Sequence, residues 1–220
     1  MSGLAARLEA IRERIRLAGG DPGAITIVAV TKGRNEGQCR EAVAAGLSAL
    51  GENRVQEALA KMAGREGQEP LAGVEWHLIG HLQTNKVRVA AGRFALIQSV
   101  DSVRLAQALG ERDPWQRVLL QVNVSRESEK HGFAPDGVVE AARELASVFR
   151  LEGLMGMGPR SGDPSGCFAE LAGLVRECRK ATGLALPVLS MGMSGDYEAA
   201  VRAGSTMLRL GTALFGEQVG

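Results

Sequence analysis

The stretch ITIVAVTKGR, from Ile25 to Arg34, shows how this chain is built. Its first six residues, Ile25–Val30, are apolar except for one threonine, and most of them are β-branched. A strand with one wet face alternates apolar and polar residues, whereas a strand of a parallel sheet is covered on both faces and reads as a continuous apolar run. The run therefore predicts a strand of a parallel sheet, and Lys32 comes directly after it.

The same pattern, a short apolar run followed by an amphipathic segment, recurs along the whole chain. Further strands are expected near residues 49–51, 76–79, 96–100, 118–124, 151–155, 187–190 and 206–210. Helices are expected near residues 36–45, 54–63, 84–91, 102–109, 136–149, 165–181 and 196–203. Strict alternation of strand and helix implies parallel strands joined by right-handed crossovers.

Eight such units predict an α/β fold, a closed (β/α)8 TIM barrel, with an open doubly wound sheet as the alternative. No shift in composition marks a linker, so residues 1–220 are expected to form a single domain. An N-terminal amphipathic helix is expected before the first strand and ends at a Gly-Gly pair. Its apolar residues recur near helical spacing, at Leu4, Leu8, Ile11, Ile15 and Leu17.

Composition and charge narrow the classes of function. Of the 220 residues, 26 are Lys or Arg and 25 are Asp or Glu, and the net charge of +1 provides no electrostatic footprint for nucleic acid or an anionic membrane. The amino terminus is charged, unlike a signal peptide, and no apolar run approaches the ~20 residues of a membrane span. With 3 cysteines no disulfide scaffold is expected, and a cytoplasmic location is the default.

Several familiar motifs do not fit. The glycine-rich segment from Gly156 to Gly162 has its last glycine one residue too late for a dinucleotide-binding loop, and Pro159 stands where the helix would begin. P-loop and nucleophile-elbow sequences are absent. His77 and His81 are four residues apart, but the residues between them are typical of a strand end rather than a helix. No metal site is therefore expected.

Lys32 is the residue that points to a chemistry. It follows the first strand, on the face of a barrel where active sites are found. An apolar surrounding disfavours an ammonium group and favours the neutral amine, which is the form that condenses with an aldehyde. A Schiff-base lysine is one interpretation of this position, and a solvated surface lysine that leaves a strand is the other.

Two loops near the carboxyl terminus suit an anion. The segments Leu189–Asp196 and Leu210–Gly216 each place small residues between an expected strand and the start of a helix. Backbone N–H groups and hydroxyls at such turns bind phosphate, and barrel enzymes commonly bind it between the loops after strands seven and eight. Taken alone, Ser194 is explained equally well as a helix cap. The two loops together predict a phosphorylated ligand.

Other polar residues leave alternatives open. Arg209 stands inside the last apolar strand and needs a partner, which is either a carboxylate across the barrel or a ring nitrogen of a ligand. Asn53 is either a helix cap or a pocket residue, and His77 is ambiguous at the expected rim. Lys130 is interpreted as a lysine of a solvated loop.

Several segments, taken in order, resemble the pyridoxal phosphate homeostasis proteins, which are relatives of the amino-terminal barrel of alanine racemase. The segments are AVTK ending at Lys32, GENxVQE ending at Glu57, WHxIGxLQxNK ending at Lys86, QVN ending at Asn123, GLM ending at Met155, LSMGMSxD ending at Asp196 and GSTMxRxGTAxFG ending at Gly216. The resemblance covers the chain from about Leu4 to Gly216.

The resemblance implies a fold-type III barrel that carries pyridoxal 5′-phosphate (PLP) as a Schiff base on Lys32, with Arg209 facing the pyridine nitrogen. The phosphate is assigned by the same resemblance to Ser194, Gly211 and Thr212. The residues expected to line the rest of the pocket are Asn53, His77 and Ser190.

Two further positions bear on the resemblance. Arg34 departs from it, because many members have a second lysine there, two places after the cofactor lysine. A transfer route that needs an amine at that position is therefore in doubt. Lys130, in contrast, matches a lysine that the family often has.

For function, the resemblance implies a protein of vitamin B6 homeostasis that stores, buffers or delivers PLP, with no established catalytic residues or reaction. The expected partners are PLP, other B6 vitamers and apo-enzymes that need the cofactor. A monomer is expected because a closed barrel covers its own sheet edges.

A slow PLP-dependent amino-acid racemase is the alternative, and an ordinary Schiff-base aldolase is a weaker one. Racemisation needs acid–base groups on both faces of the substrate carbon. In alanine racemases a tyrosine from a second domain of the partner subunit serves one face, and no such domain is expected in this chain. Its one tyrosine, Tyr197, is expected to pack at a helix start.

Overall fold

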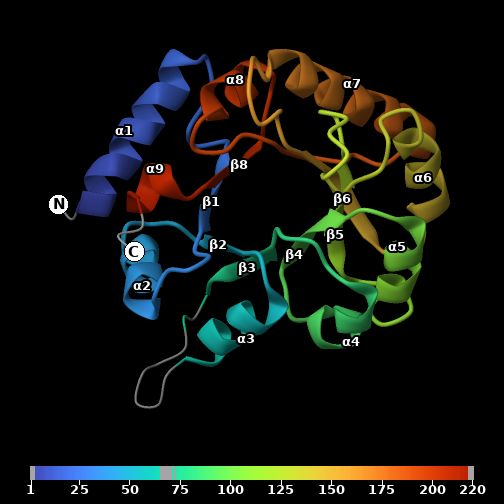
Figure 1. The fold of residues 1–220 in the computed structure, drawn as a ribbon, viewed down its shortest axis with the longest axis horizontal. Coiled ribbons are helices and arrows are strands. Elements are labelled where there is room, and N and C mark those ends of the chain that lie inside the picture. The colour runs from blue at the N-terminus through green and yellow to red at the C-terminus, as the bar shows by residue number, and fades with distance from the viewer. Residues whose placement is uncertain (1–2, 65–70, 72, 218–220) are drawn as a thin grey trace.

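The computed structural model describes residues 3–64, 71 and 73–217. In this part of the chain eight parallel strands close into a barrel in sequence order (Figure 1). The pairing of β1 with β8, which sets Val28 opposite Arg209, closes the sheet. This confirms the predicted closed barrel and excludes the open sheet. The strands are Thr26–Val30 (β1), Ala49–Glu52 (β2), Glu75–Leu78 (β3), Leu96–Val100 (β4), Arg117–Val122 (β5), Arg150–Gly156 (β6), Val188–Ser190 (β7) and Met207–Leu210 (β8).

Helices surround the barrel, as the predicted alternation requires (Figure 1). The expected helix near 84–91 is instead a 3-10 turn, Thr84–Lys86 (η1), followed by one short helical turn. The expected helix near 136–149 is shorter than predicted, because the chain after Leu145 turns back towards β6. The helices are Gly3–Leu17 (α1), Glu36–Ala44 (α2), Val55–Ala63 (α3), Val87–Ala90 (α4), Val103–Gly110 (α5), Val138–Leu145 (α6), Ser165–Thr182 (α7), Tyr197–Arg202 (α8) and Thr212–Phe215 (α9).

Each strand buries both of its faces, but against different surroundings. In β8 the side chains of Leu208 and Leu210 belong to the large apolar core between barrel and helices, whereas Met207 belongs to a small core inside the barrel. Successive strand residues point to opposite faces. Arg209 therefore projects into the barrel on the same side as Met207. The residues of the inner core are Val28, Ala49, Leu96, Leu119, Met155 and Met207.

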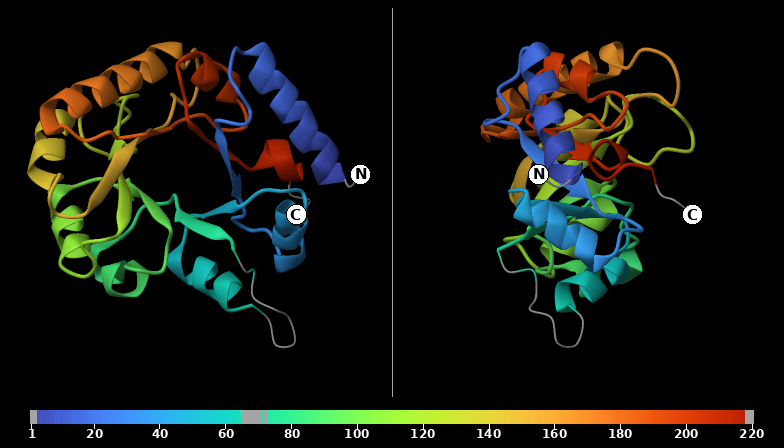
Figure 2. Two further views of the ribbon diagram at one scale, coloured as in Figure 1. Left: turned by 180° about the vertical axis from the view of Figure 1, so that it is seen from behind. Right: turned by 90° about the vertical axis from the view of Figure 1, so that its left-hand side faces the viewer.

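The amino-terminal helix α1 packs its apolar stripe onto the barrel beside the last helix. Leu4, Leu8, Ile11 and Ile15 are buried, as their spacing predicts. The Nε of Arg7 donates a hydrogen bond to the carbonyl of Leu214, at 2.5 Å, and this bond connects α1 to α9. Both views in Figure 2 show the two helices side by side, so the first and last elements of the chain lie together near the carboxyl end of β8.

In the described residues, no helix combines the length and the apolar character that a bilayer span requires.

Candidate functional site

A cavity of about 340 Å3 opens at the carboxyl ends of β1, β2 and β8. Six of the eight residues expected around the cofactor line it: Lys32, Asn53, Ser194, Arg209, Gly211 and Thr212. The structure thus brings the lysine after β1 and both predicted anion loops to one place. The remaining lining residues, which sequence reasoning did not single out, are Val30, Ile79, Met157, Met193 and Gly195. Their apolar side chains carry no chemical signal in the sequence.

Lys32 lies at the mouth of this cavity and is exposed. The side chain is therefore not enclosed by the apolar surrounding that was expected for it. The backbone on either side of it is held. Gly33 N donates to a carboxylate oxygen of Glu57 at 2.8 Å, and the carbonyl of Thr31 accepts from Lys61 Nζ at 2.7 Å.

A buried ion pair lies behind this loop. Glu52, at the end of β2, is fully buried, and its Oε1 accepts from Thr31 Oγ1 at 2.6 Å and from Lys61 Nζ at 2.5 Å. Lys61 comes from α3 and also approaches Glu57 at 3.2 Å. The two elements on either side of the β2–α3 turn thus fix the peptide that carries Lys32. The sequence contained no signal for this pairing apart from the charges themselves.

The β1–α2 loop is closed on its other side by a helix cap. The side chain of Asn35 accepts from Gln38 N at 2.9 Å, and Gln38 Oε1 accepts from Asn35 N at 3.1 Å, which is a complete capping box. Arg34 stands where many members of the resembled family have a second lysine. Its side chain points away from the first cavity. Its guanidinium donates to the carbonyl of Gly216 at 2.5 Å and lies 5.3 Å from the ring centre of Phe215. Arg34 therefore connects the lysine loop to α9.

The two anion loops meet through one hydroxyl. Ser194 Oγ, in the loop after β7, accepts hydrogen bonds from Gly211 N at 3.2 Å and Ala213 N at 3.1 Å, in the turn after β8. A Cβ atom added at Gly195 would meet nothing within 4 Å, so the space beside this loop is open. Backbone N–H groups that converge on an oxygen atom in this way are the donors that a phosphate requires.

Arg209 is the buried cation of the cavity. It is 4% exposed, and its Nη1 donates to Ser190 Oγ at 2.7 Å and its Nη2 to the carbonyl of Gly156 at 2.9 Å. Burial lowers the pKa of Arg209 to about 10, and the carboxylate of Asp196 acts in the opposite direction. The group is therefore charged near neutral pH and acts only as a hydrogen-bond donor. The carboxylate partner across the barrel that the sequence left open is not what the guanidinium binds.

His77 and Ser190 were also expected around the cofactor, but they are not among the residues that line this cavity. Both lie within strands and are buried inside the barrel, behind Arg209. Ser190 Oγ donates to Gln98 Oε1 at 2.6 Å, and Gln98 Nε2 lies 3.0 Å from His77 Nδ1. A chain of hydrogen bonds thus runs from Arg209 through Ser190 and Gln98 to His77. The register of the strands explains this position, because it directs both side chains into the barrel one layer below the rim.

Burial determines the charge of His77. It lowers the pKa of the imidazole to about 4, and the neighbouring carboxylate of Glu75 acts in the opposite direction. Because Gln98 Nε2 donates to Nδ1, the proton of the neutral ring is on Nε2. That atom has no hydrogen bond, and the nearest carboxylate oxygen, on Glu75, is 3.6 Å away. His77 is therefore a neutral imidazole at the end of this series of hydrogen bonds, and it does not lie at the rim of the barrel.

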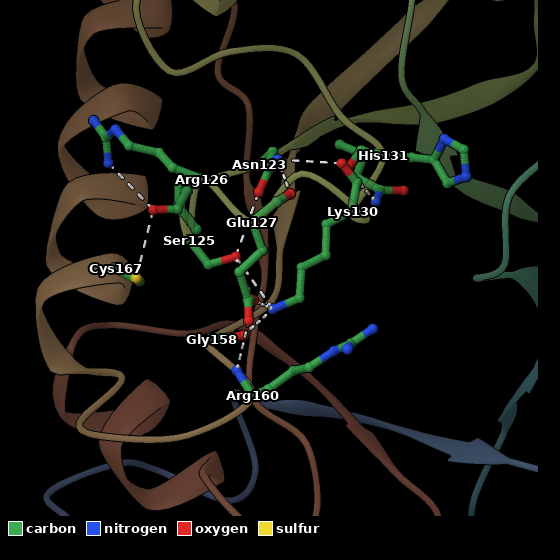
Figure 3. A network of polar contacts seen from close by, with 11 residues as sticks. Asn123, Ser125, Arg126, Glu127, Lys130, His131, Gly158, Arg160 and Cys167 are labelled. Atoms are coloured by element: carbon green, nitrogen blue, oxygen red, sulfur yellow. Dashed lines mark hydrogen bonds and ion pairs between the residues drawn. The ribbon is translucent and has the colours of Figure 1, made fainter.

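Lys130 differs from the solvated loop lysine that was expected. Its ammonium donates to the carbonyl of Gly158 at 2.6 Å and to Ser125 Oγ at 3.1 Å, and it forms an ion pair with Glu127 (Figure 3). The side chain is 14% exposed. It lines a second cavity of about 360 Å3, which shares Met157, Met193 and Gly195 with the first.

Comparisons with known proteins identify the family. Residues 6–219 match the family described as "Alanine racemase, N-terminal domain". A pyridoxal phosphate homeostasis protein of Pseudomonas aeruginosa is 43% identical over 213 residues, which cover 94% of this chain and 90% of that protein. The chain belongs to the pyridoxal phosphate homeostasis protein family.

Solved structures of the family resemble this chain closely. PipY of Synechococcus elongatus, without PLP, has a TM-score of 0.87 and 35% identity, covering 97% of this chain and 100% of that chain. PipY with PLP bound has a TM-score of 0.83 and 34% identity, with the same coverage. The pyridoxal phosphate homeostasis family thus shares this barrel over almost its whole length, as the sequence resemblance implied.

Tyr197 lies outside the lining of the first cavity. Its side chain is 3% exposed, and the guanidinium of Arg14 lies 5.7 Å from its ring centre. Burial raises the pKa of its hydroxyl. The ring belongs to the apolar core and not to the lining of the first cavity. Tyr197 therefore packs against the amino-terminal helix, in accord with the role expected for it.

Proposed function

We propose that this protein binds PLP in the first cavity and acts in vitamin B6 homeostasis by storing, buffering or delivering the cofactor. The observation that carries the proposal is that Lys32, Ser194 and Gly211 line one open cavity. The hydroxyl of Ser194 accepts a hydrogen bond there from the backbone N–H of Gly211. The cavity provides a separate feature for each part of PLP. Lys32 is the amine for its aldehyde, and the donors around Ser194 suit its phosphate. Arg209 is a buried donor for its pyridine nitrogen.

When bound, PLP supplies an aldehyde carbon and an electron-withdrawing ring. The residues of this chain determine how that chemistry is used. Arg209 donates a hydrogen bond and has no proton acceptor to offer, so it favours an unprotonated pyridine nitrogen. An unprotonated ring is a weaker electron sink. This arrangement suits holding the cofactor better than activating a substrate.

The acid–base groups around the cavity support the same proposal. Among the described residues that line it, Lys32 and Arg209 are the titratable ones. Arg209 is held below the rim by Ser190 and Gly156, and Tyr197 packs elsewhere. Racemisation requires one base on each face of the substrate carbon. We therefore infer a binding protein. Slow racemisation is the alternative, and a proton-exchange experiment distinguishes the two functions.

Four further features belong to the proposal. Residues 1–220 form one PLP-binding domain, which functions as a monomer because the closed barrel leaves no strand edge for pairing. The protein works in the cytoplasm. Its ligands include other B6 vitamers that share the ring and phosphate. The recipients of PLP are apo-enzymes that use it.

Borohydride reduction of the PLP-loaded protein tests the proposal, because reduction makes the link between cofactor and lysine permanent. Peptide mass mapping is expected to find the adduct on Lys32. Lys32→Ala should lose the adduct and the visible absorbance, whereas Lys180→Ala, an exposed lysine of α7, should keep both. An adduct on another lysine, or none, would overturn the assignment.

Proton exchange separates the two functions. We expect the loaded protein to leave L-alanine unchanged in deuterated water, with neither α-deuteration nor loss of chirality. Rapid exchange that Lys32→Ala abolishes would establish the racemase instead. For delivery, mixing the loaded protein with an apo PLP enzyme should restore that enzyme's activity faster than spontaneous release of PLP allows.

A further inference from the structure

Three potential metal ligands converge at the rim of the barrel, away from the phosphate loops. His81, Asp101 and His131 lie in the loops after β3, β4 and β5, and each offers one ligand atom within 4.8 Å of the other two. His81 Nδ1 is 2.7 Å from Asp101 Oδ2, and His131 Nδ1 is 3.8 Å from the same oxygen. The His131 side chain points away from the Lys130 network (Figure 3).

We propose that His81, Asp101 and His131 bind one divalent transition-metal ion, Zn2+ or an ion of similar chemistry, with water completing the coordination. Two imidazoles and one carboxylate form a donor set that Zn2+ takes in sites with an open fourth position. Metal–ligand distances of about 2.0–2.1 Å place tetrahedral ligand atoms about 3.3 Å apart. The two separations from Asp101 Oδ2 lie on either side of that value.

The backbone positions the ligands from rigid elements. The carbonyl of Gly80, next to His81, accepts from Ser99 Oγ at 2.7 Å, and Ser99 precedes Asp101 by two residues. Gly80 itself packs against Asn53, since a Cβ there would lie 2.3 Å from the Asn53 carbonyl oxygen. The backbone that carries these ligands therefore needs little reorganisation on metal binding.

The loop after β5 is held equally well. The carbonyl of His131 accepts from Gln121 Nε2 at 2.8 Å, and Phe133 N donates to the carbonyl of Gln121 at 2.8 Å. Asn123 Nδ2 donates to the carbonyls of Glu127 and Lys130 (Figure 3). The backbone of His131 is therefore fixed by these hydrogen bonds, while its side chain, 59% exposed, has room to turn.

Metal binding requires one side-chain movement. The two imidazole rings are stacked, with centroids 3.9 Å apart and planes 12° apart. Parallel stacked rings cannot both direct a nitrogen lone pair at one ion, because each ion–nitrogen bond lies in the plane of its ring. The more exposed His131 must turn out of the stack. His81 must also give up its hydrogen bond with Asp101, so that both of these residues bind the same metal ion.

The bound ion would connect three successive strand ends beside the cofactor cavity. Asn53 lines that cavity and also borders the surface pocket to which His81 contributes. The loop that carries His131 also carries Lys130, whose contacts border the second cavity. The ion would therefore stiffen the β3–β5 side of the rim. The phosphate loops after β7 and β8 would be unaffected.

Titration of the untagged, PLP-loaded protein with Zn2+ by calorimetry tests the proposal. We expect one ion per chain, and Co2+ should produce the visible absorption of a tetrahedral site. His81→Asn, Asp101→Asn and His131→Asn should each weaken binding by roughly tenfold or more. The Asp163→Asn variant should bind Zn2+ as the parent does, since Asp163 is an exposed aspartate whose carboxylate accepts from Ser165 N at the start of α7.

Near-UV circular dichroism of the same samples separates loss of a ligand from loss of the fold. The visible cofactor band separates this proposal from the proposed function, because metal binding does not depend on Lys32 and should persist in Lys32→Ala. Absence of Zn2+ binding in the folded protein would overturn the site. Binding that survives both His81→Asn and Asp101→Asn would overturn it as well.

Discussion

The ammonium of Lys61 lies 2.5 Å from a carboxylate oxygen of Glu52, and both side chains sit under the peptide that presents Lys32. Glu52 is fully buried and Lys61 is 12% exposed. A buried pair of this kind is costly to break, because the partner that remains is an uncompensated charge in an apolar surrounding. The pair therefore defines where the backbone leaves β1 and enters the site.

Lys61→Met is expected to lower the free energy of unfolding by roughly 3–5 kcal/mol, since it leaves the Glu52 carboxylate buried without its cation. Urea denaturation measures the change. The exposed pair formed by Arg143 and Glu140 supplies the control, and Arg143→Gln should change stability by less than about 1 kcal/mol. Glu52→Gln together with Lys61→Met should be less destabilised than Lys61→Met alone. Equal effects of the buried and exposed substitutions would contradict this account.

The chain of hydrogen bonds behind Arg209 predicts non-additive substitutions. Ser190→Ala removes the acceptor of Arg209 Nη1 and the donor to Gln98, and it should lower stability by about 1–3 kcal/mol. In a double-mutant cycle with Gln98→Leu, the coupling free energy should be about 0.5–3 kcal/mol. Ser165→Ala, at an exposed hydroxyl, should stay within about 0.5 kcal/mol of the parent. If the free-energy changes of Ser190→Ala and Gln98→Leu were strictly additive, the hydrogen bonds behind Arg209 would not act as a unit.

His77 predicts a specific loss of stability in acid. Its pKa falls from 6.5 to about 4 on folding because burial disfavours the imidazolium, so the unfolded chain binds the proton more readily. The stabilisation of the folded protein by neutral His77 is therefore complete above pH 6.5. It is lost as the pH falls towards 4, and the loss is about 3 kcal/mol in all. Unfolding free energies between pH 7.5 and 4 should therefore fall less steeply in His77→Gln than in the parent. Parallel curves would contradict a buried neutral histidine.

One substitution, glycine to alanine, is expected to have opposite effects at two positions. Gly153 in β6 has φ +156°, and an added Cβ would lie 1.7 Å from the carbonyl oxygen of Val188 in β7. Gly153→Ala must therefore push two barrel strands apart, and we expect a loss of more than about 3 kcal/mol. Gly173 lies inside α7, where an added Cβ would make only an ordinary contact of 3.8 Å with the guanidinium of Arg176, so Gly173→Ala should stabilise by up to about 1 kcal/mol. Thermal unfolding of the two variants measures both signs.

The strands were predictable because a parallel barrel buries each of them on both faces. Leu96–Val100 reads as an apolar run with two polar residues, and the structure has β4 at those residues. Short helices were less predictable. The 84–91 segment has helical spacing, but only Val87–Ala90 is α-helical, since Thr84–Lys86 forms a 3-10 turn and the backbone leaves the helical conformation at Ala91. Periodicity indicates which face is buried, not where tertiary contacts stop a helix.

The site was predictable where its residues follow strands directly. Residues just after a parallel strand must lie at one rim, so Lys32 and Ser194 fall together without further information. Residues within strands are different. His77 and Ser190 were placed on the pocket wall, but their register points them into the barrel one layer below. Lys130 was placed in solvent, but long-range contacts with Gly158 bury its side chain.

From the order of its residues alone, this chain specified an eightfold barrel, an amine after the first strand and two turns of small residues after the last two strands, which together predict an anion site. These features are local, because each depends on neighbours a few positions away. Packing decided the rest: the Glu52–Lys61 pair under the lysine loop, the path from Arg209 to His77, and the meeting of His81, Asp101 and His131. The directly bonded partners along the first two are 9 to 92 residues apart, the three members of the last group lie on separate loops, and only the folded barrel brings them into contact.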